Sequence, residues 1–192
     1  MVVSGCGNGA GGTAVAALTT PTDLPARTAI TADKATVPFG TWGVVKAVIT
    51  GGTTDRTDVF AIKVTAVIKG RPGDKKGMQS ANGPLGVNVA TAVPYYVSYS
   101  YATLAGTSYE TPTQDVYVDD GTPDGFVTIM IGSPGEHCRP AADVNLSQSF
   151  GEAHSGCAVA LTDKSNPPTA LIYTYLHGSQ DVRFSLPAPS GP

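Results

Sequence analysis

A regular alternation of apolar and polar side chains runs through residues 58–69. Side chains two positions apart share one face of an extended strand, so this stretch predicts a strand with one buried and one exposed face. Such a strand needs a second layer to cover its apolar face. The predicted inward positions are Phe60, Ile62, Val64, Ala66 and Ile68, and the predicted outward positions are Lys63, Thr65 and Lys69.

Short apolar runs of the same kind recur along the chain, separated by Gly, Pro and Asp turns, with almost no helical pattern. The run that follows Trp42 is apolar on both faces, which predicts either a central strand or a strand packed under a loop. The spacing of about ten residues near the end of the chain is typical of an antiparallel β-sandwich. The additional predicted strands are 44–49, 94–101, 115–118, 126–131, 157–161, 170–176 and 182–186.

Composition divides the 192 residues into one domain and two tails. Residues 35–187 are predicted to form the sandwich. Residues 1–34 are predicted to form a disordered Gly/Thr/Ala/Pro tether, and residues 188–192 a loose tail. The net charge of −3 gives no basis for nucleic-acid binding, which needs a clustered basic surface. No run of about 18 apolar residues predicts a membrane-spanning helix.

The first residues, Val3-Ser4-Gly5-Cys6, resemble the lipobox of bacterial lipoproteins. That resemblance implies that Cys6 is lipidated and becomes the mature N-terminus, so the membrane would be reached through a lipid anchor. The Gly-rich stretch 7–12 is typical of the tether that follows such a cysteine. Only residues 1–5 precede Cys6, where a complete signal would also carry basic and apolar regions. The alternative is an ordinary free cysteine in a tail.

Two cysteines and two histidines gather in the last third of the chain: His137, Cys138, His154 and Cys157. Because Cys6 has its own explanation, the remaining two cysteines predict a Cys138–Cys157 disulfide, which would stabilise the fold by roughly 3 kcal/mol. Zinc is the alternative, but adjacent residues in a strand face opposite ways, which disfavours His137 and Cys138 as joint ligands. No metal and no cofactor are therefore expected.

An acid/base cluster could form if that disulfide brings Glu136 and His137 close to Glu152 and His154. A hydrolase using His137 and His154 is accordingly an alternative function. Polar residues beside a surface disulfide are the simpler interpretation, and no catalytic residue is assigned.

Tyrosines recur on one side of the predicted strand 94–101, at Tyr95, Tyr99 and Tyr101, with Val97 between them. Because tyrosine is amphipathic and favoured in contact patches, these residues are a candidate binding surface. The alternative is that they form the rim of a core.

Two loops carry charge. The basic Gly-rich loop 70–77 does not match a phosphate-binding loop and is predicted to be a solvated turn, with contact to an anionic cell-wall polymer as the alternative. The acidic connection 119–125 lacks the spacing of a calcium loop and is predicted to be a turn.

The end of the chain resembles the end of immunoglobulin-like domains of secreted proteins from actinobacteria and other Gram-positive bacteria, and the resemblance covers about residues 35–187. The residues that carry the resemblance are 150–152, 156–161, Pro167-Pro168, the Leu-Ile-Tyr strand 171–173 and the closing Val-x-Phe-x-Leu-Pro of 182–187, together with Phe60, Ile62 and Val64 earlier in the chain. The resemblance implies a small β-sandwich attached to or released from the envelope, and no shared enzymatic activity.

These observations together predict an all-β, immunoglobulin-like antiparallel β-sandwich, held outside the cytoplasm by a lipid anchor. Its expected role is binding or presentation of a protein partner or a cell-envelope component, without catalysis. An untethered secreted adaptor, whose N-terminal segment docks a protein partner, is the alternative.

Overall fold

The structure is a computed structural model that describes residues 23–49, 55–75, 79–80, 91–106, 116–121, 126–127, 130–131, 150–162, 166–174 and 180–189. Almost all of its regular structure is β. The strands are β1 (Thr36–Val37), β2 (Gly43–Ile49), β3 (Arg56–Lys69), β4 (Gln79–Ser80), β5 (Val93–Ala105), β6 (Val116–Asp119), β7 (Phe126–Val127), β8 (Met130–Ile131), β9 (His154–Thr162), β10 (Ala170–Thr174) and β11 (Asp181–Ser185), with one 3-10 turn, η1 (Pro72–Lys75).

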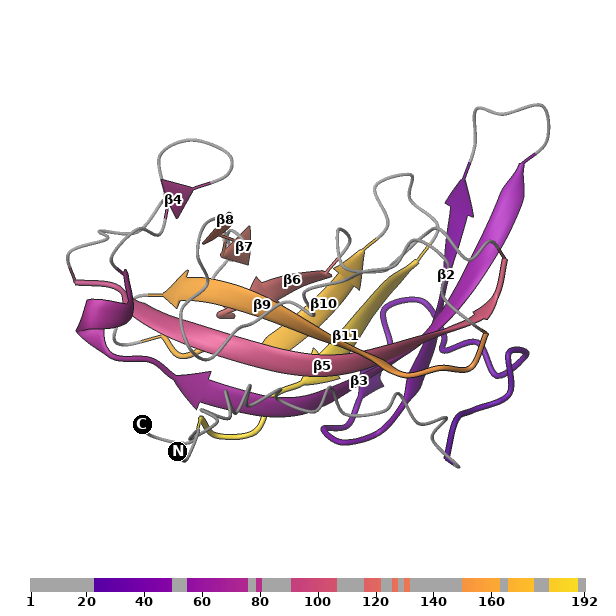
Figure 1. Ribbon diagram of the computed structural model, residues 1–192, viewed down its shortest axis with the longest axis horizontal. Helices are drawn as coiled ribbons and strands as arrows, with labels where there is room; N and C mark the ends of the chain where they lie inside the picture. The colour runs from indigo at the N-terminus through magenta and orange to yellow at the C-terminus, as the bar shows by residue number, and fades with distance from the viewer. Residues whose placement is uncertain are drawn as a thin grey trace, which may run out of the picture.

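The strands form two main sheets. Sheet A has the order β1-β11-β10-β6-β7, and sheet B has the order β2-β3-β5-β9. β1 and β11 are parallel, whereas the other pairs in both sheets are antiparallel. A separate two-stranded ribbon joins β4 to β8. In Figure 1 the long strands β3 and β5 run across the molecule, and β10 and β11 cross them at an angle.

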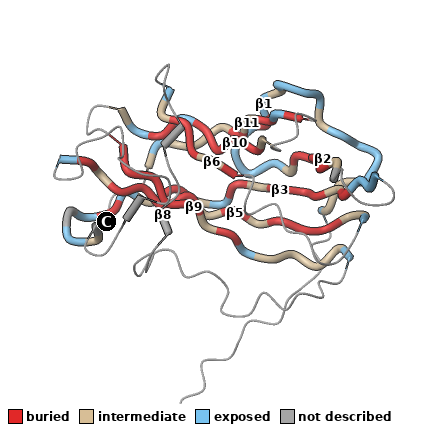
Figure 2. The backbone as a smooth tube through the Cα atoms, turned by 90° about the horizontal axis from the view of Figure 1, so that it is seen from above, coloured by how far each residue is buried: buried red, intermediate tan, exposed pale blue. Residues whose placement is uncertain are grey.

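The inward faces of the two sheets meet in one apolar core. Sheet A contributes alternate residues such as Leu171, Tyr173, Val182 and Phe184, and sheet B contributes alternate residues of β3, β5 and β9. Figure 2 shows the buried positions concentrated along the strands of both sheets. Burial of every second side chain is what the period-two pattern predicts. The all-β, two-sheet architecture expected from the sequence is thus confirmed.

The predicted inward face of residues 58–69 is correct through Val64 and wrong beyond it. Val64 is opposite Tyr99 and Ala66 is opposite Ser98, so Thr65 is an extra residue that forms a β-bulge in β3. The bulge reverses the alternation, and Val67 takes the core position instead of Ala66 or Ile68. Ile68 packs on the opposite face of sheet B, in a second buried cluster with Ala92, Tyr96, Val159 and Leu161.

β2 is an edge strand of sheet B, and its free edge is covered by the segment before it. The Thr31 N–H donates to the Val44 carbonyl at 2.9 Å, and the Val44 N–H donates to Thr31 Oγ1 at 2.9 Å. Of the two predictions for this apolar strand, the structure fits the one that packs it under a loop. Residues 23–34, which the sequence assigns to the tether, are therefore part of the ordered body of the protein.

The side-chain amide of Gln180 completes this cover, and we refer to it as the Gln180 bridge. Gln180 Oε1 accepts the Lys46 N–H at 2.8 Å, and Gln180 Nε2 donates to the Thr31 carbonyl. Gln180 is 4% exposed, so the polar atoms of a buried side chain are satisfied by two partly buried backbone groups. The bridge joins the N-terminal segment, β2 and the start of β11. A further contact holds the segment farther out, where Lys63 Nζ lies 2.9 Å from Asp23 Oδ2.

Candidate functional site

An open groove of about 260 Å³ lies on the outer face of sheet A, and its lining residues are Lys34, Ile172, Thr174, Asp181 and Arg183. The alternation of β10 and β11 determines this lining. Ile172 is opposite Arg183 and Thr174 is opposite Asp181. Because Leu171, Tyr173, Val182 and Phe184 enter the core, the residues between them face outward. The groove thus combines an apolar floor, a hydroxyl group and three charged side chains.

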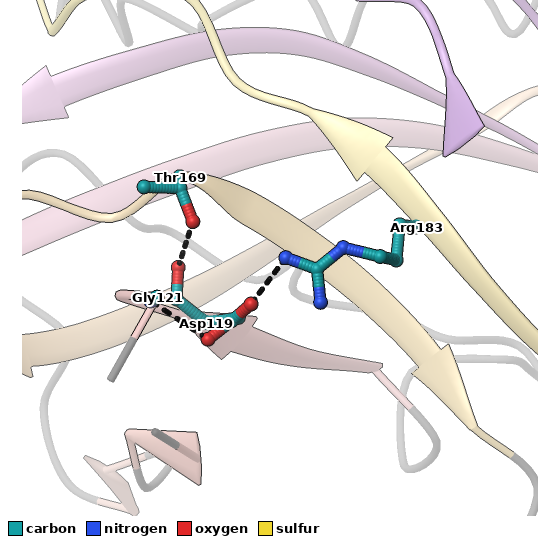
Figure 3. A network of polar contacts seen from close by, with 4 residues as sticks. All are labelled: Asp119, Gly121, Thr169 and Arg183. Carbon is teal, nitrogen blue, oxygen red and sulfur yellow. Dashed lines mark hydrogen bonds and ion pairs between the residues drawn. The ribbon is translucent and has the colours of Figure 1, made fainter. Parts of the chain in front are cut away.

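Arg183 is held in place by a buried carboxylate on the neighbouring part of the sheet. Its guanidinium forms an ion pair with Asp119 Oδ2, and Asp119 Oδ1 accepts the Gly121 N–H at 2.8 Å. The Thr169 N–H donates to the Asp119 carbonyl at 2.7 Å, so the backbone is fixed as well. Figure 3 shows one terminal nitrogen of Arg183 directed at Asp119 and the other directed away from it. The Asp119 side chain is 10% exposed and that of Arg183 is 42% exposed, so the arginine connects a buried anchor to the surface.

The two remaining charges of the groove are Lys34 and Asp181. Their backbones are joined, because the Lys34 N–H donates to the Asp181 carbonyl. The Asp181 N–H in turn donates to the side chain of Asp33, at 2.8 Å from Oδ1. In the part of the chain that the structure describes, neither side chain has an ion-pair partner. Lys34 also has φ of +59°, a left-handed conformation that favours glycine over lysine. The groove therefore presents one ammonium and one carboxylate that are not neutralised.

Replacing Asp119 with asparagine is expected to lower the free energy of unfolding by about 1 kcal/mol, because it removes the charge that pairs with a half-exposed arginine. Urea unfolding of the variant measures this loss. Asp55→Asn is the matched control, since Asp55 is exposed. Equal effects of the two substitutions would show that Asp119 does not anchor Arg183.

Cys157 lies on β9 and is disulfide-bonded. The other two cysteines, Cys6 and Cys138, lie outside the described residues, as do Glu136 and His137. The Cys138–Cys157 pairing and the lipidation of Cys6 therefore stay predictions. A sulfur in a disulfide is not a thiolate, so Cys157 is not available as a zinc ligand in this state.

His154 packs against an aromatic neighbour at the start of β9. Its ring is stacked on Tyr101, with ring centroids 5.5 Å apart and planes inclined by 28°. Its Nε2 atom is buried and has no hydrogen-bond partner among the residues that the structure describes. Burial lowers the pKa of His154 below its ordinary value of 6.5, and the nearby charge of Glu152 opposes this shift. The surroundings favour a neutral imidazole that stacks on Tyr101.

Acidification is expected to destabilise the protein through His154. Because the pKa of His154 is lowered in the folded state, the unfolded chain binds more protons below about pH 6.5, and the free energy of unfolding falls as the pH falls toward the folded-state pKa. Urea unfolding at about pH 7.5 and pH 5.5 measures this dependence. His154→Phe keeps a ring against Tyr101 and cannot titrate, so its stability should change less between the two values. An unchanged pH dependence would rule out His154 as its source.

The tyrosines proposed as a contact surface lie in the core instead. Tyr95, Tyr99 and Tyr101 are 3%, 2% and 2% exposed, and all three pack between the sheets together with Val97. Burial raises the pKa of Tyr99, as expected for a phenol removed from water. These residues form no exposed patch in this structure, and the core alternative describes where they lie.

The charged loops are described only in part. In the basic loop, the Arg71 N–H donates to Asp74 Oδ2 at 2.7 Å, which is a local turn contact. In the acidic connection, Asp119 is engaged by Arg183, and Asp124 lies outside the described residues. Among the residues that can be described, no group of three or more His, Cys, Asp or Glu side chains could hold a metal ion.

The groove itself has no signal in the sequence. Its residues come from three separated segments, around positions 34, 172–174 and 181–183, and no short motif connects them. Two positions could have drawn attention: an arginine alternating with the apolar residues Val182 and Phe184, and an aspartate at the end of an apolar run. Both indicate outward charges on strands, but only the sheet order shows that they meet.

Comparison of the chain with protein-family models, curated proteins and solved structures found no match in any of the three. Over the described ranges, no helix is long and apolar enough to cross a membrane. Function is therefore inferred from the chain's own residues.

Proposed function

We propose that this protein is a lipid-anchored, extracytoplasmic β-sandwich domain that binds or presents a protein partner or an envelope component without catalysing a reaction. The observation that carries the proposal is the disulfide-bonded state of Cys157. Disulfides form and persist outside the cytoplasm and are rare inside it. A lipobox-like Cys6 ahead of such a domain supports attachment to the outer side of a membrane.

The groove supports the binding role. It is concave and places apolar surface beside a few charged groups, a combination that ligand sites also have, although its volume is at the small end for such sites. The Asp119 carboxylate pre-orients Arg183, so little side-chain entropy would be lost on binding. His154, the one member of the proposed His137/His154 pair that the structure describes, stacks on Tyr101 with a buried Nε2, which does not favour the hydrolase alternative.

The order of the strands supports an immunoglobulin-like sandwich as the specific fold. If β5, β6, β7, β9, β10 and β11 correspond to strands B, C, C′, E, F and G, then sheet A contains the order G-F-C-C′ and sheet B places B beside E. β3 then takes the position of strand A beside B, and β2 is an additional strand at that edge. Cys157 lies on the strand that corresponds to E, which differs from the B–F disulfide of antibody domains.

Mass spectrometry of the protein from its native cells tests the anchor. We expect a mature chain that begins at an acylated Cys6 and separates with the membrane fraction, and we expect Cys6→Ser to move the protein to the soluble extracellular fraction. Non-reducing peptide mapping should give a Cys138–Cys157 cross-link. A free Cys6 thiol in the native protein would instead support the secreted adaptor.

A further inference from the structure

Charged side chains of both signs line the groove on sheet A. Lys34 and Arg183 supply two cations, and Asp181 supplies one carboxylate. Two further carboxylates near the groove are already engaged. Asp119 pairs with Arg183 and accepts the Gly121 N–H, and Asp33 accepts the Asp181 N–H. A ligand that complements this lining would place a negative group beside Lys34 and the free side of Arg183, and a positive group beside Asp181.

Arg183 is prepared to accept a carboxylate. A guanidinium has five N–H donors in a planar fork, and the bond to Asp119 leaves donors on the side turned away from it. Arginine–carboxylate contacts through two parallel N–H groups are stronger and more specific than a single bond. Lys34 lies in the same lining and adds a second positive charge. Its backbone is left-handed, a conformation that would be less strained with glycine, so a lysine at this position has some cost in stability.

The size and the floor of the groove limit what else the ligand can contain. A volume of about 260 Å³ holds a molecule of roughly amino-acid size, since one water molecule occupies about 30 Å³ of liquid. Ile172 provides the apolar floor, and the Thr174 hydroxyl can donate or accept one hydrogen bond.

We propose that this groove binds a zwitterion of amino-acid type, in which a free carboxylate meets Arg183 and Lys34, a free ammonium meets Asp181, and an apolar side chain lies against Ile172. The proposal rests on the proposed binding role and names its ligand class. A ligand with only negative charge would be repelled by Asp181, and a ligand with only positive charge would be repelled by Lys34 and Arg183.

Titration of the full-length chain with L-leucine, followed by amide chemical shifts in NMR spectra, tests this directly. Leucinamide lacks the carboxylate, and N-acetyl-leucine lacks the ammonium. We expect L-leucine to shift the amides of residues 34, 172–174 and 181–183, and to bind at least about tenfold more tightly than either blocked compound. In alanyl-alanine a peptide bond lies between the ammonium and the carboxylate. Tighter binding of alanyl-alanine than of L-leucine would identify a short peptide as the ligand, and the reverse order would identify a free amino acid.

Substitutions of the exposed side chains Asp181 and Lys34 test the two charged ends of the ligand separately. Asp181→Asn should weaken L-leucine at least about tenfold and should strengthen N-acetyl-leucine, because the substitution removes the carboxylate that repels it. Lys34→Gln should weaken L-leucine and N-acetyl-leucine and should strengthen leucinamide, because it removes an ammonium that repels the ligand's own. Lys69→Gln and Asp55→Asn, which alter exposed charges of sheet B and the turn before it, are the matched controls and should change nothing.

Three results would overturn the proposal: no shifts in the groove with either zwitterion at tens of millimolar, equal affinity for L-leucine and both blocked compounds, or insensitivity of binding to Asp181→Asn and Lys34→Gln. None of them bears on lipidation. Conversely, a missing acyl group on Cys6 would refute the anchor and leave this titration unaffected.

Discussion

Replacing Gly106 with alanine is expected to lower the free energy of unfolding by about 2–5 kcal/mol. Gly106 has φ of +111°, a backbone conformation that residues with a Cβ rarely adopt. An added Cβ would also lie 2.0 Å from Asp58 Oδ1 and 2.7 Å from the Asp58 Cα atom. Because Asp58 is fully buried and part of β3, neither its side chain nor its backbone can move aside easily. Urea unfolding of the purified variant measures the loss.

Gly40→Ala is the control that separates the two causes. Gly40 also has a positive φ, +75°, but nothing lies within 4 Å of the position that an added Cβ would occupy. Its substitution should therefore cost only the backbone strain, on the order of 1 kcal/mol. Equal losses for Gly106→Ala and Gly40→Ala would mean that contact with Asp58 is not part of the penalty.

The second large effect is expected for Gly156→Ala on β9, at about 1–3 kcal/mol. Gly156 is the cross-strand partner of Tyr99, and the tyrosine ring lies over the glycine. An added Cβ would meet two ring carbons of Tyr99 at 2.3 Å each. The ring is buried between the sheets, so relief requires displacement of the core or of β9.

Thermal or urea unfolding of Gly156→Ala should be compared with Gly73→Ala, where nothing lies within 4 Å of the added Cβ. Gly73→Ala should change stability by no more than roughly 0.5 kcal/mol. The double variant Gly156→Ala/Tyr99→Leu provides the decisive cycle. If the ring causes the penalty, the loss in the double variant should be smaller than the sum of the two single losses. Strict additivity would contradict the proposed clash.

The alternation of apolar and polar residues predicts which face of a strand is buried, but not where that alternation is interrupted. Phe60, Ile62 and Val64 fall on the buried face as expected, because a strand with a fixed period has one apolar face that must be covered. The phase then changes at Thr65, since a bulge adds a residue without leaving a distinct signature in composition. Bulges depend on how a strand fits its neighbours, which a single strand's pattern does not contain.

For the candidate site, the sequence predicts less than it does for the strands. Tyr95, Tyr99 and Tyr101 share a face in the sequence pattern, but a tyrosine can cover a core or a surface equally well, and only the position of sheet A decides that they are buried. The groove depends on sheet order, which brings Lys34 beside β11 and β11 beside β10. Periodicity identifies which residues point outward, whereas topology decides which of them become neighbours.

The Gln180 bridge also bears on how the chain reaches its native state. Its bonds connect residues separated by 134 and 149 positions, so the edge of β2 and the segment around Thr31 cannot be completed before the end of the polypeptide is available. Contacts of such long sequence separation slow folding, because the loop between them must close first. During synthesis, an incomplete chain would expose a bare strand edge, which is the kind of surface that recruits chaperones or aggregates.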